Sequence, residues 1–209
     1  MKTKIINFSK FSSFKIGPTL HVRVIEKLED FEHIFSSILN NESNKPYLIG
    51  SCNNLLISDN PPSLVMLSKN YDYIKLEDNL LKIGAATPSG KIASFCKKNN
   101  IANFEFISHL PGTLGGLVFM NAGLKEYEIF NNLISITTNK EILKKQNIEH
   151  GYRYTKINDI ILEASFSVEL GYDEEKIAMF KQMRSNQPSI ASAGSCFKNP
   201  KNDYAGRLI

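Results

Sequence analysis

The segment from Ser108 to Gly123 constrains the fold of this chain most strongly, because it gathers several glycines around a short apolar run. It reads Ser-His-Leu-Pro-Gly-Thr-Leu-Gly-Gly-Leu-Val-Phe-Met-Asn-Ala-Gly. Gly112 follows a proline and can adopt turn angles that other residues avoid, and Gly115 with Gly116 lets the backbone come close to a ligand. If the apolar run is a short helix, its N-terminus favours an anion at the same place. A phosphate-binding loop and a tight turn packed under a helix both remain open here.

A second polar loop follows an expected strand in the first part of the chain. Residues 47–49 (Tyr-Leu-Ile) are typical of a short strand, and the loop Gly50-Ser51-Cys52-Asn53-Asn54 comes directly after them. Small polar residues at the carboxyl end of a strand are where α/β units usually bind ligands. An asparagine-rich turn without a ligand explains the same residues equally well.

Composition narrows the class of protein. The chain has 209 residues, of which 42% are hydrophobic, so it has room for two packed units with a sizeable core. The formal charge of +4 is modest and the basic residues are scattered, so we expect no nucleic-acid partner. Three cysteines, far apart, favour a reducing compartment and argue against a disulfide framework or a metal site. We find no signal peptide and no bilayer-spanning run, so we expect a cytoplasmic protein without a membrane partner.

The periodicity of apolar residues predicts alternating strands and helices. We expect a first unit over residues 1–63 with a small β-α-β arrangement, a second over 64–170 and a third, short unit over 171–209. Strands are expected at residues 21–25, 47–49, 64–67, 73–76, 80–83, 133–136 and 160–170. Helices are expected at residues 28–39, 88–98 and 172–183, with Thr87 as the N-cap of the second.

Two further clusters carry candidate chemistry. Arg153 lies between Tyr152 and Tyr154, and a guanidinium held between aromatic rings is a rigid clamp for a carboxylate. A surface arginine stacked on tyrosine is the plain alternative. Ser195 follows a glycine in Gly194-Ser195-Cys196-Phe197-Lys198-Asn199-Pro200, but it lacks the Gly-x-Ser-x-Gly elbow of a hydrolase. A hydrogen-bonding turn serine is the alternative there.

Taken in order, these motifs resemble one enzyme family. The resemblance rests on the segments Gly50 to Leu56, Leu110 to Gly116, Asn121-Ala122-Gly123, Tyr152 to Thr155 and Gly194 to Pro200, and it runs from Phe14-Lys15-Ile16-Gly17 to the end of the chain. The chain is similar to the UDP-N-acetylenolpyruvoylglucosamine reductases, the MurB flavoenzymes of bacterial peptidoglycan synthesis. Five motifs in a fixed order are far more specific than any one of them.

The resemblance implies an α+β fold of the vanillyl-alcohol oxidase (PCMH) type that binds FAD. Residues 1–63 and 64–170 would be the two FAD-binding subdomains, and residues 171–209 the start of an α/β substrate-binding domain. The FAD would be noncovalent, with backbone N–H groups around its pyrophosphate. The residues implied in FAD binding are Gly50, Ser51, Cys52, Asn53, Asn54, Pro111, Gly112, Thr113, Gly115, Gly116, Asn121, Ala122 and Gly123.

The resemblance also implies the chemistry. NADPH would reduce the FAD, which would pass hydride to the enolpyruvyl ether of a UDP-sugar. Arg153 would bind the substrate carboxylate and stabilise its growing charge, and Ser195 would donate a proton to the α carbon. Tyr152, Lys198 and Asn199 would contact the substrate. We expect a monomer without metal.

The chain departs from the family pattern at two places. Cys52 and Asn53 stand where many relatives have a glycine and a serine, which puts individual hydrogen bonds of that loop in doubt. The sequence also stops at Ile209, before the segment in which the family carries its catalytic glutamate, so we expect an incomplete substrate domain. The chain matches the shorter branch of the family. An FAD-binding fragment without activity is therefore one alternative. A flavin oxidase is less favoured, because residues 50–54 lack the histidine that often tethers FAD in those enzymes.

Overall fold

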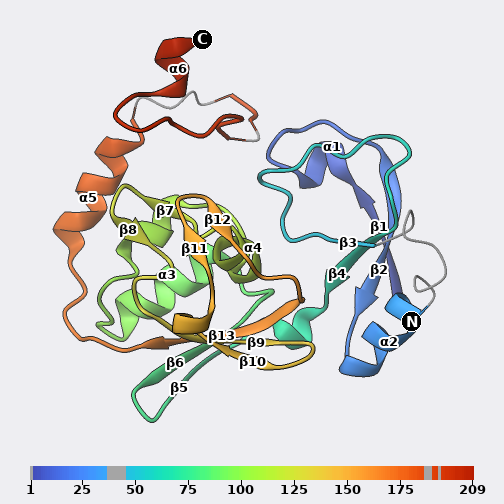
Figure 1. The fold of residues 1–209 in the computed structure, drawn as a ribbon, viewed down its shortest axis with the longest axis horizontal. Helices are drawn as coiled ribbons and strands as arrows, with labels where there is room; N and C mark the ends of the chain where they lie inside the picture. The colour runs from blue at the N-terminus through green and yellow to red at the C-terminus, as the bar shows by residue number, and fades with distance from the viewer. Residues whose placement is uncertain (1, 37–45, 186–189, 193) are drawn as a thin grey trace.

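The computed structural model describes residues 2–36, 46–185, 190–192 and 194–209. Two lobes, each built on its own sheet, lie side by side, and the C-terminal part of the chain lies beside both (Figure 1). None of the described helices is long and apolar enough to cross a membrane.

The first lobe is built on a sheet with the strand order β1-β2-β4-β3. β1 pairs antiparallel with β2, whereas β4 runs parallel to both of its neighbours. The strands and helices expected in this part of the sequence are therefore confirmed, except that residues 37–39 of the expected helix lie outside the described residues. The elements of this lobe are β1 (Lys2–Asn7), α1 (Phe8–Phe11), β2 (Thr19–Ile25), α2 (Leu28–Ser36), β3 (Tyr47–Leu48) and β4 (Leu64–Leu67).

The position of β4 differs from the expected division of the chain. A boundary between residues 63 and 64 assigns this strand to the second unit, but its backbone hydrogen-bonds to β2 and β3 of the first sheet. Leu64 and Val65 are also buried in the first lobe. An apolar run identifies a strand but not the sheet that it joins, because strand pairing is decided by contacts distant in sequence.

The second lobe is built on a five-stranded antiparallel sheet within the described residues, with the order β10-β9-β13-β6-β5. Helices α3 and α4 lie on one face of it (Figure 1). The bounds are β5 (Ile74–Glu77), β6 (Leu80–Gly84), α3 (Ser89–Lys98), α4 (Leu114–Phe119), β9 (Leu133–Thr138), β10 (Ile142–Lys144) and β13 (Ile161–Ser167). The expected strand over 160–170 thus ends early, and Leu170 makes only an isolated bridge to Ile101.

The start of α3 corrects the expected cap. Pro88, not Thr87, is the N-cap residue, and it has no side chain to bind the free N–H groups. The hydroxyl of Thr87 instead donates to the carbonyl of Tyr73, 3.1 Å away. This bond connects the turn after β6 with the residue directly before β5, which explains why a capping residue type stands one position too early.

Short elements connect the larger ones. Two small hairpins extend from the second lobe, β7 (Gly123–Leu124) with β8 (Tyr127–Glu128), and β11 (His150–Gly151) with β12 (Tyr154–Thr155). Within the described part of the chain, the 3-10 turns are η2 (Lys69–Tyr71), η3 (Glu105–His109) and η4 (Lys145–Asn147).

An apolar seam joins the lobes. Leu162 of β13 lies in one buried cluster with Ile25, Phe31, Ile34 and Val65 of the first lobe. A separate, larger core fills the second lobe between its sheet, α3 and α4. The two lobes therefore share buried side chains as well as a connecting chain.

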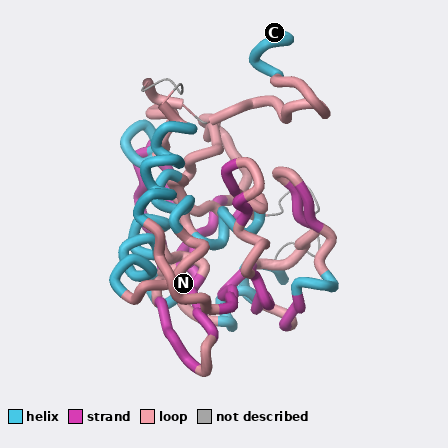
Figure 2. The backbone as a smooth tube through the Cα atoms, turned by 90° about the vertical axis from the view of Figure 1, so that its left-hand side faces the viewer, coloured by secondary structure: helices cyan, strands magenta, loops and turns pink. Residues whose placement is uncertain are grey.

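Helix α5 (Glu174–Met183) packs against the second lobe. Asp173 caps it by accepting a hydrogen bond from the N–H of Glu175 at 2.9 Å, so the helix begins two residues later than expected. Phe180 is fully buried, and its ring contacts those of Phe106 and Tyr127 edge-on. The final helix α6 (Ala205–Leu208) lies apart from both sheets in Figures 1 and 2.

Candidate functional site

The two glycine-containing loops meet, although one comes from each lobe. A methyl group placed on Gly50 would lie 2.6 Å from the hydroxyl oxygen of Thr113, too close for any real side chain. A methyl group on Gly112 would lie 3.9 Å from the side-chain nitrogen of Asn53. Loop 50–54 and loop 111–116 are therefore neighbours, as a shared ligand requires.

Both loops present unused backbone donors. Among the described residues, the N–H groups of residues 50–54, Gly112, Thr113 and Gly116 donate no hydrogen bond to protein. By contrast, the N–H groups of Leu114 and Gly115 donate to the carbonyls of Thr87 and Ala85 at 2.9 Å. Free N–H groups that converge from two loops, one of them leading into a helix, suit the oxygens of a pyrophosphate. The loops thus fit the phosphate part of FAD.

Cys52 occupies the most constrained position of the first loop. Its φ of 53° lies in the left-handed region that favours glycine. Its side chain is buried, and burial raises the pKa of the thiol to about 11. Cys52 therefore keeps the shape of a glycine turn while its neutral sulfur packs in the lobe.

The two adjacent glycines of the second loop have different surroundings. A methyl group on Gly115 would meet the Cβ and carbonyl oxygen of Ala85 at 3.2 Å, so close packing accounts for this glycine. A methyl group on Gly116 would approach only the Thr113 hydroxyl, at 3.8 Å. Gly116 is therefore the residue of the pair with open space beside it.

Asn121, Ala122 and Gly123 lie within the second lobe. The buried amide of Asn121 donates to the carboxylate of Glu128 at 2.7 Å and to the carbonyl of Gly151 at 3.1 Å, and its oxygen accepts from the N–H of Phe130. The side chain thereby connects hairpin β7–β8 with hairpin β11–β12. These bonds account for the residue structurally, because both amide hydrogens of the side chain are donated to the protein.

Arg153 lies at the tip of hairpin β11–β12. Its φ of 52° is left-handed, which is unfavourable for an arginine. The guanidinium carbon lies 5.7 Å from the centre of the Tyr152 ring, so the stacking considered from the sequence is present. Tyr154 faces another cation, the amine of Lys198, at 5.8 Å.

The guanidinium of Arg153 reaches the predicted serine segment. Its Nη1 donates to the backbone carbonyls of Ser195, at 2.9 Å, and Phe197, at 3.2 Å. Its Nε and Nη2 donate no hydrogen bond to any described residue. The structure therefore brings together two candidate residues 42 positions apart and leaves one edge of the arginine for a ligand.

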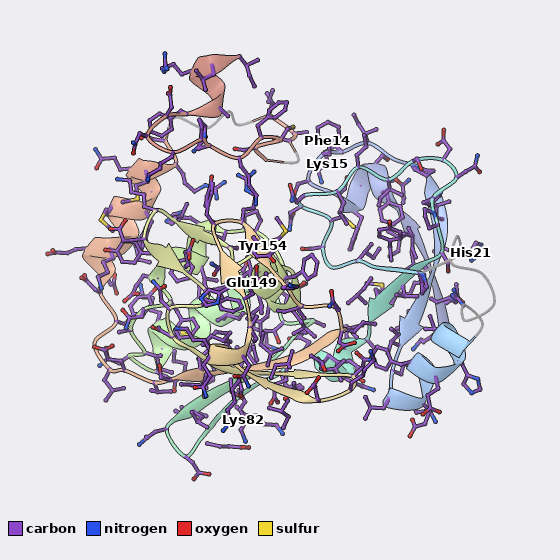
Figure 3. The ribbon with its side chains drawn as sticks, viewed as in Figure 1. Phe14, Lys15, His21, Lys82, Glu149 and Tyr154 are labelled. Carbon is purple, nitrogen blue, oxygen red and sulfur yellow. The ribbon has the colours of Figure 1, made fainter. Side chains whose placement is uncertain are left out.

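Charged groups surround the base of this hairpin. Glu149 accepts hydrogen bonds from the Tyr154 hydroxyl at 2.9 Å and from the Lys156 amine at 3.3 Å (Figure 3). These bonds hold the pKa of Glu149 below its usual range, and the bond to Glu149 raises the pKa of Tyr154. Asn199 is used locally, since its side-chain oxygen accepts from the N–H of Ala205 at 3.0 Å.

The sequence interpretation missed two residues at the rim of the site. Ser13 donates its N–H to the carbonyl of Cys52 at 3.4 Å and its hydroxyl to the side chain of Asn53. Arg184, at the end of α5, donates to the carbonyl of His109 at 2.5 Å, next to loop 111–116. Only the position of Ser13, directly before the start of the resembling segment at Phe14, offered a signal.

Comparisons with known proteins show that the chain is similar to enzymes that share one name. It is 43% identical over 210 residues to the UDP-N-acetylenolpyruvoylglucosamine reductase of Campylobacter jejuni (strain RM1221), a match that covers 98% of this chain and 76% of that protein. It is 43% identical over 209 residues to the protein of the same name from Helicobacter hepaticus, covering 100% of this chain and 77% of that protein. No model of a protein family matches the chain.

The comparison with solved structures shows which fold the chain has. The crystal structure of UDP-N-acetylenolpyruvylglucosamine reductase (MurB) from Thermus caldophilus matches with a TM-score of 0.84 and 22% identity, over 100% of this chain and 79% of that one. The expected α+β class, with the PCMH-type FAD-binding architecture, is confirmed. The two lobes with facing glycine loops thus define a protein with the fold of that reductase. The chain belongs to the UDP-N-acetylenolpyruvoylglucosamine reductase (MurB) family.

Proposed function

We propose that this protein reduces UDP-N-acetylglucosamine enolpyruvate to UDP-N-acetylmuramate, with NADPH as reductant and noncovalent FAD as cofactor, in the synthesis of peptidoglycan precursors. The names of its close relatives support the substrate. The observation that carries the proposal is the contact of the Arg153 guanidinium with the backbone of Ser195. A nucleotide-linked substrate and three unpaired cysteines suit the cytoplasm.

The FAD would lie between the lobes, which we divide near Leu67 in accordance with the sheets. Loop 50–54 and residues Pro111 to Gly116 would hold its pyrophosphate through their free N–H groups, without mobile side-chain charge. When bound, FAD supplies hydride transfer from NADPH to the enolpyruvyl double bond. The contacts of Asn121 favour a supporting role for this residue behind the loop, and Ala122 and Gly123 remain proposed FAD-binding residues.

Arg153 would bind the carboxylate of the enolpyruvyl group. Its Nη1 is used by the carbonyls of Ser195 and Phe197, while Nε and Nη2 form the edge that can make two parallel bonds to a carboxylate. Negative charge spreads into that carboxylate as hydride arrives at the β carbon, so the arginine stabilises the transition state more than the ground state. Tyr152, stacked on the guanidinium, limits its freedom.

Ser195 would donate the proton that the α carbon receives. An alcohol is a weak acid, but a carbanionic centre is basic enough to take its proton when the geometry is fixed. The bond from Arg153 to the Ser195 carbonyl fixes the serine backbone next to the group that binds the carboxylate. Lys198, over the ring of Tyr154, and Asn199 extend the same surface toward the rest of the UDP-sugar.

The test is spectroscopic and kinetic. The purified chain should show flavin absorbance that acid precipitation releases into the supernatant, and it should oxidise NADPH only when the enolpyruvyl substrate is added. Flavin that stays in the precipitate would contradict noncovalent binding. NADPH oxidation independent of the substrate would indicate an oxidase instead.

A further inference from the structure

Ser13 lies between the proposed cofactor loop and the chain segment that carries Ser195. On one side its hydroxyl donates to Asn53 and its N–H to the carbonyl of Cys52. On the other side its carbonyl accepts the N–H of Ser192, at 3.2 Å. Figure 3 shows the neighbouring Phe14 and Lys15 on the rim of the first lobe that faces the C-terminal segment.

The segment held by Ser13 is the one that Arg153 holds from the second lobe. Arg153 binds the carbonyls of Ser195 and Phe197, three and five positions beyond Ser192. The segment, defined as residues 190–192 and 194–199, is otherwise mostly exposed, so few packing contacts fix it. Hydrogen bonds thus run from Asn53 through Ser13 and Ser192 to the N–H of Gly194, the residue directly before the proton-donor candidate.

We infer that Ser13 is a positioning residue that couples occupation of the loop at residues 50–54 to the placement of Ser195. The inference rests on the proposed function, which assigns FAD to that loop. A ligand that orders Asn53 and the Cys52 carbonyl also orders Ser13, whose carbonyl then holds Ser192 and, through it, the serine segment. Once the cofactor has ordered these groups, substrate binding no longer bears the conformational entropy cost of ordering them. Cofactor binding therefore prepares the position of the proton donor.

The test compares the full chain with Ser13→Ala, which removes only the hydroxyl, and with Ser13→Thr, which keeps it. Ser9→Ala is the matched control, because the Ser9 hydroxyl donates to the side chain of Asn7, the N-cap residue of α1, and to no other described residue. Amide hydrogen exchange at Ser192 is measured with and without FAD. In the native chain and the control, saturating FAD should slow this exchange by about fivefold or more, the lower end of usual coupling between sites. Ser13→Ala keeps both backbone bonds but loses the hydroxyl bond to Asn53, so the response should fall to less than half of the native one, whereas Ser13→Thr should keep it.

Half-reactions give a second readout. With FAD saturating, Ser13→Ala should be reduced by NADPH at the native rate, whereas reoxidation by the enolpyruvyl substrate should slow by about tenfold or more, since small displacements of reacting groups are costly. A purely structural role would lower thermal stability and FAD affinity but leave both rates intact at saturation.

Two results would overturn the inference. Equal slowing of Ser192 exchange by FAD in native and Ser13→Ala chains would mean that the cofactor shields the amide directly. Unchanged reoxidation in Ser13→Ala would mean that the serine segment does not depend on Ser13. If the native chain binds no FAD, the proposed function fails instead. The FAD-free comparison then still tests Ser13. Without the hydroxyl bond to Asn53 the Ser13 carbonyl is held less firmly, so Ser192 should exchange faster in Ser13→Ala than in the control, and equal rates would refute the inference.

Discussion

Arg153 combines an unfavourable backbone with an exposed, functional side chain. A left-handed conformation costs a non-glycine residue about 1–2 kcal/mol, and such strain persists where the surrounding structure requires it. At this hairpin tip, the conformation turns the chain between Gly151 and Tyr154 while Arg153 reaches the carbonyls of Ser195 and Phe197. The arginine is thus a structural anchor and a proposed substrate ligand at once.

Replacing Arg153 by lysine tests whether these two roles need the planar guanidinium or only a positive charge. Lysine keeps the positive charge but cannot serve two carbonyls and a carboxylate from one planar group. We expect Arg153→Lys to raise the KM for the enolpyruvyl substrate and to slow flavin reoxidation, with NADPH reduction unaffected. Stopped-flow absorbance measures the rates of the two half-reactions. A native rate of reoxidation in the lysine variant would refute the two parallel bonds proposed between the guanidinium and the substrate carboxylate.

Ser195→Ala should act on one half-reaction only. We expect NADPH to reduce the bound flavin normally, while reoxidation by substrate slows by about 10²–10⁴-fold, the usual cost of losing a general acid. The backbone carbonyl that binds Arg153 is retained in alanine, so the segment keeps its place. Cys196→Ala, one residue further along, serves as the control. Normal reoxidation in Ser195→Ala would remove this serine as the proton donor.

The three cysteines should differ in reactivity. Burial raises the pKa of Cys52 to about 11 and that of Cys96 to about 12, whereas Cys196 is exposed. Because the thiolate is the reactive form, DTNB at mildly alkaline pH should label one thiol quickly and all three only after unfolding. Cys196→Ser should abolish the fast phase, and two fast thiols in the native chain would contradict the burial of Cys52 or Cys96.

At the scale of elements, the helices and strands with a periodic apolar pattern were predictable from the sequence, whereas elements without such a pattern were not. Helix α3 and strands β2, β6 and β13 have clear apolar periodicity. β1 has one buried side chain, Ile6, so its strand conformation comes from pairing with β2 and not from a local pattern. Hairpin β11–β12 is too short for any periodicity, although it carries Arg153.

The candidate site followed a similar division. The loops at 50–54 and 111–116 could be identified from the sequence, because glycines and small polar residues that leave the backbone accessible stand next to one another in the chain. The proximity of Arg153 to Ser195 depended on family resemblance, since no local pattern links residues so distant in sequence. The role of Ser13 could not be predicted, because it comes from hydrogen bonds to two segments that only the fold brings together, although its position directly before Phe14 offered a signal.

The glycines of α4 provide a test of the proposed phosphate site. Gly116→Val introduces a side chain into open space, so the fold should survive while FAD affinity falls by about tenfold or more, a change of about 1.4 kcal/mol. Gly90→Val in α3, where a methyl group also meets no neighbouring atom, is the matched control. Flavin fluorescence quenching measures the affinity. Gly115→Val is not diagnostic, because it would clash with Ala85 and disturb folding itself. Native FAD affinity in folded Gly116→Val would place the phosphates elsewhere.

At the scale of the whole molecule, one side chain anchors α5 to the second lobe. Phe180 is fully buried against Phe106 and Tyr127, so Phe180→Ala should lower the free energy of unfolding by about 3–5 kcal/mol. Lys181→Ala, on the exposed side of the same helix, should change it by less than about 0.5 kcal/mol. Denaturant unfolding followed by circular dichroism measures both. A loss in Phe180→Ala no greater than in the control would mean that α5 contributes nothing to the stability of the second lobe.

The apolar seam around Leu162 has a consequence for how a ligand enters and leaves. A hinge motion that swung the lobes apart would expose Ile25, Phe31, Ile34 and Val65 to water, and each buried side chain of this kind resists such exposure by roughly 1.5–3 kcal/mol. The spacing between the glycine loops is therefore set during folding, before any ligand arrives. Association with a cofactor should accordingly follow a single concentration-dependent step, and its release should proceed through local movement of loops while the lobes stay in place.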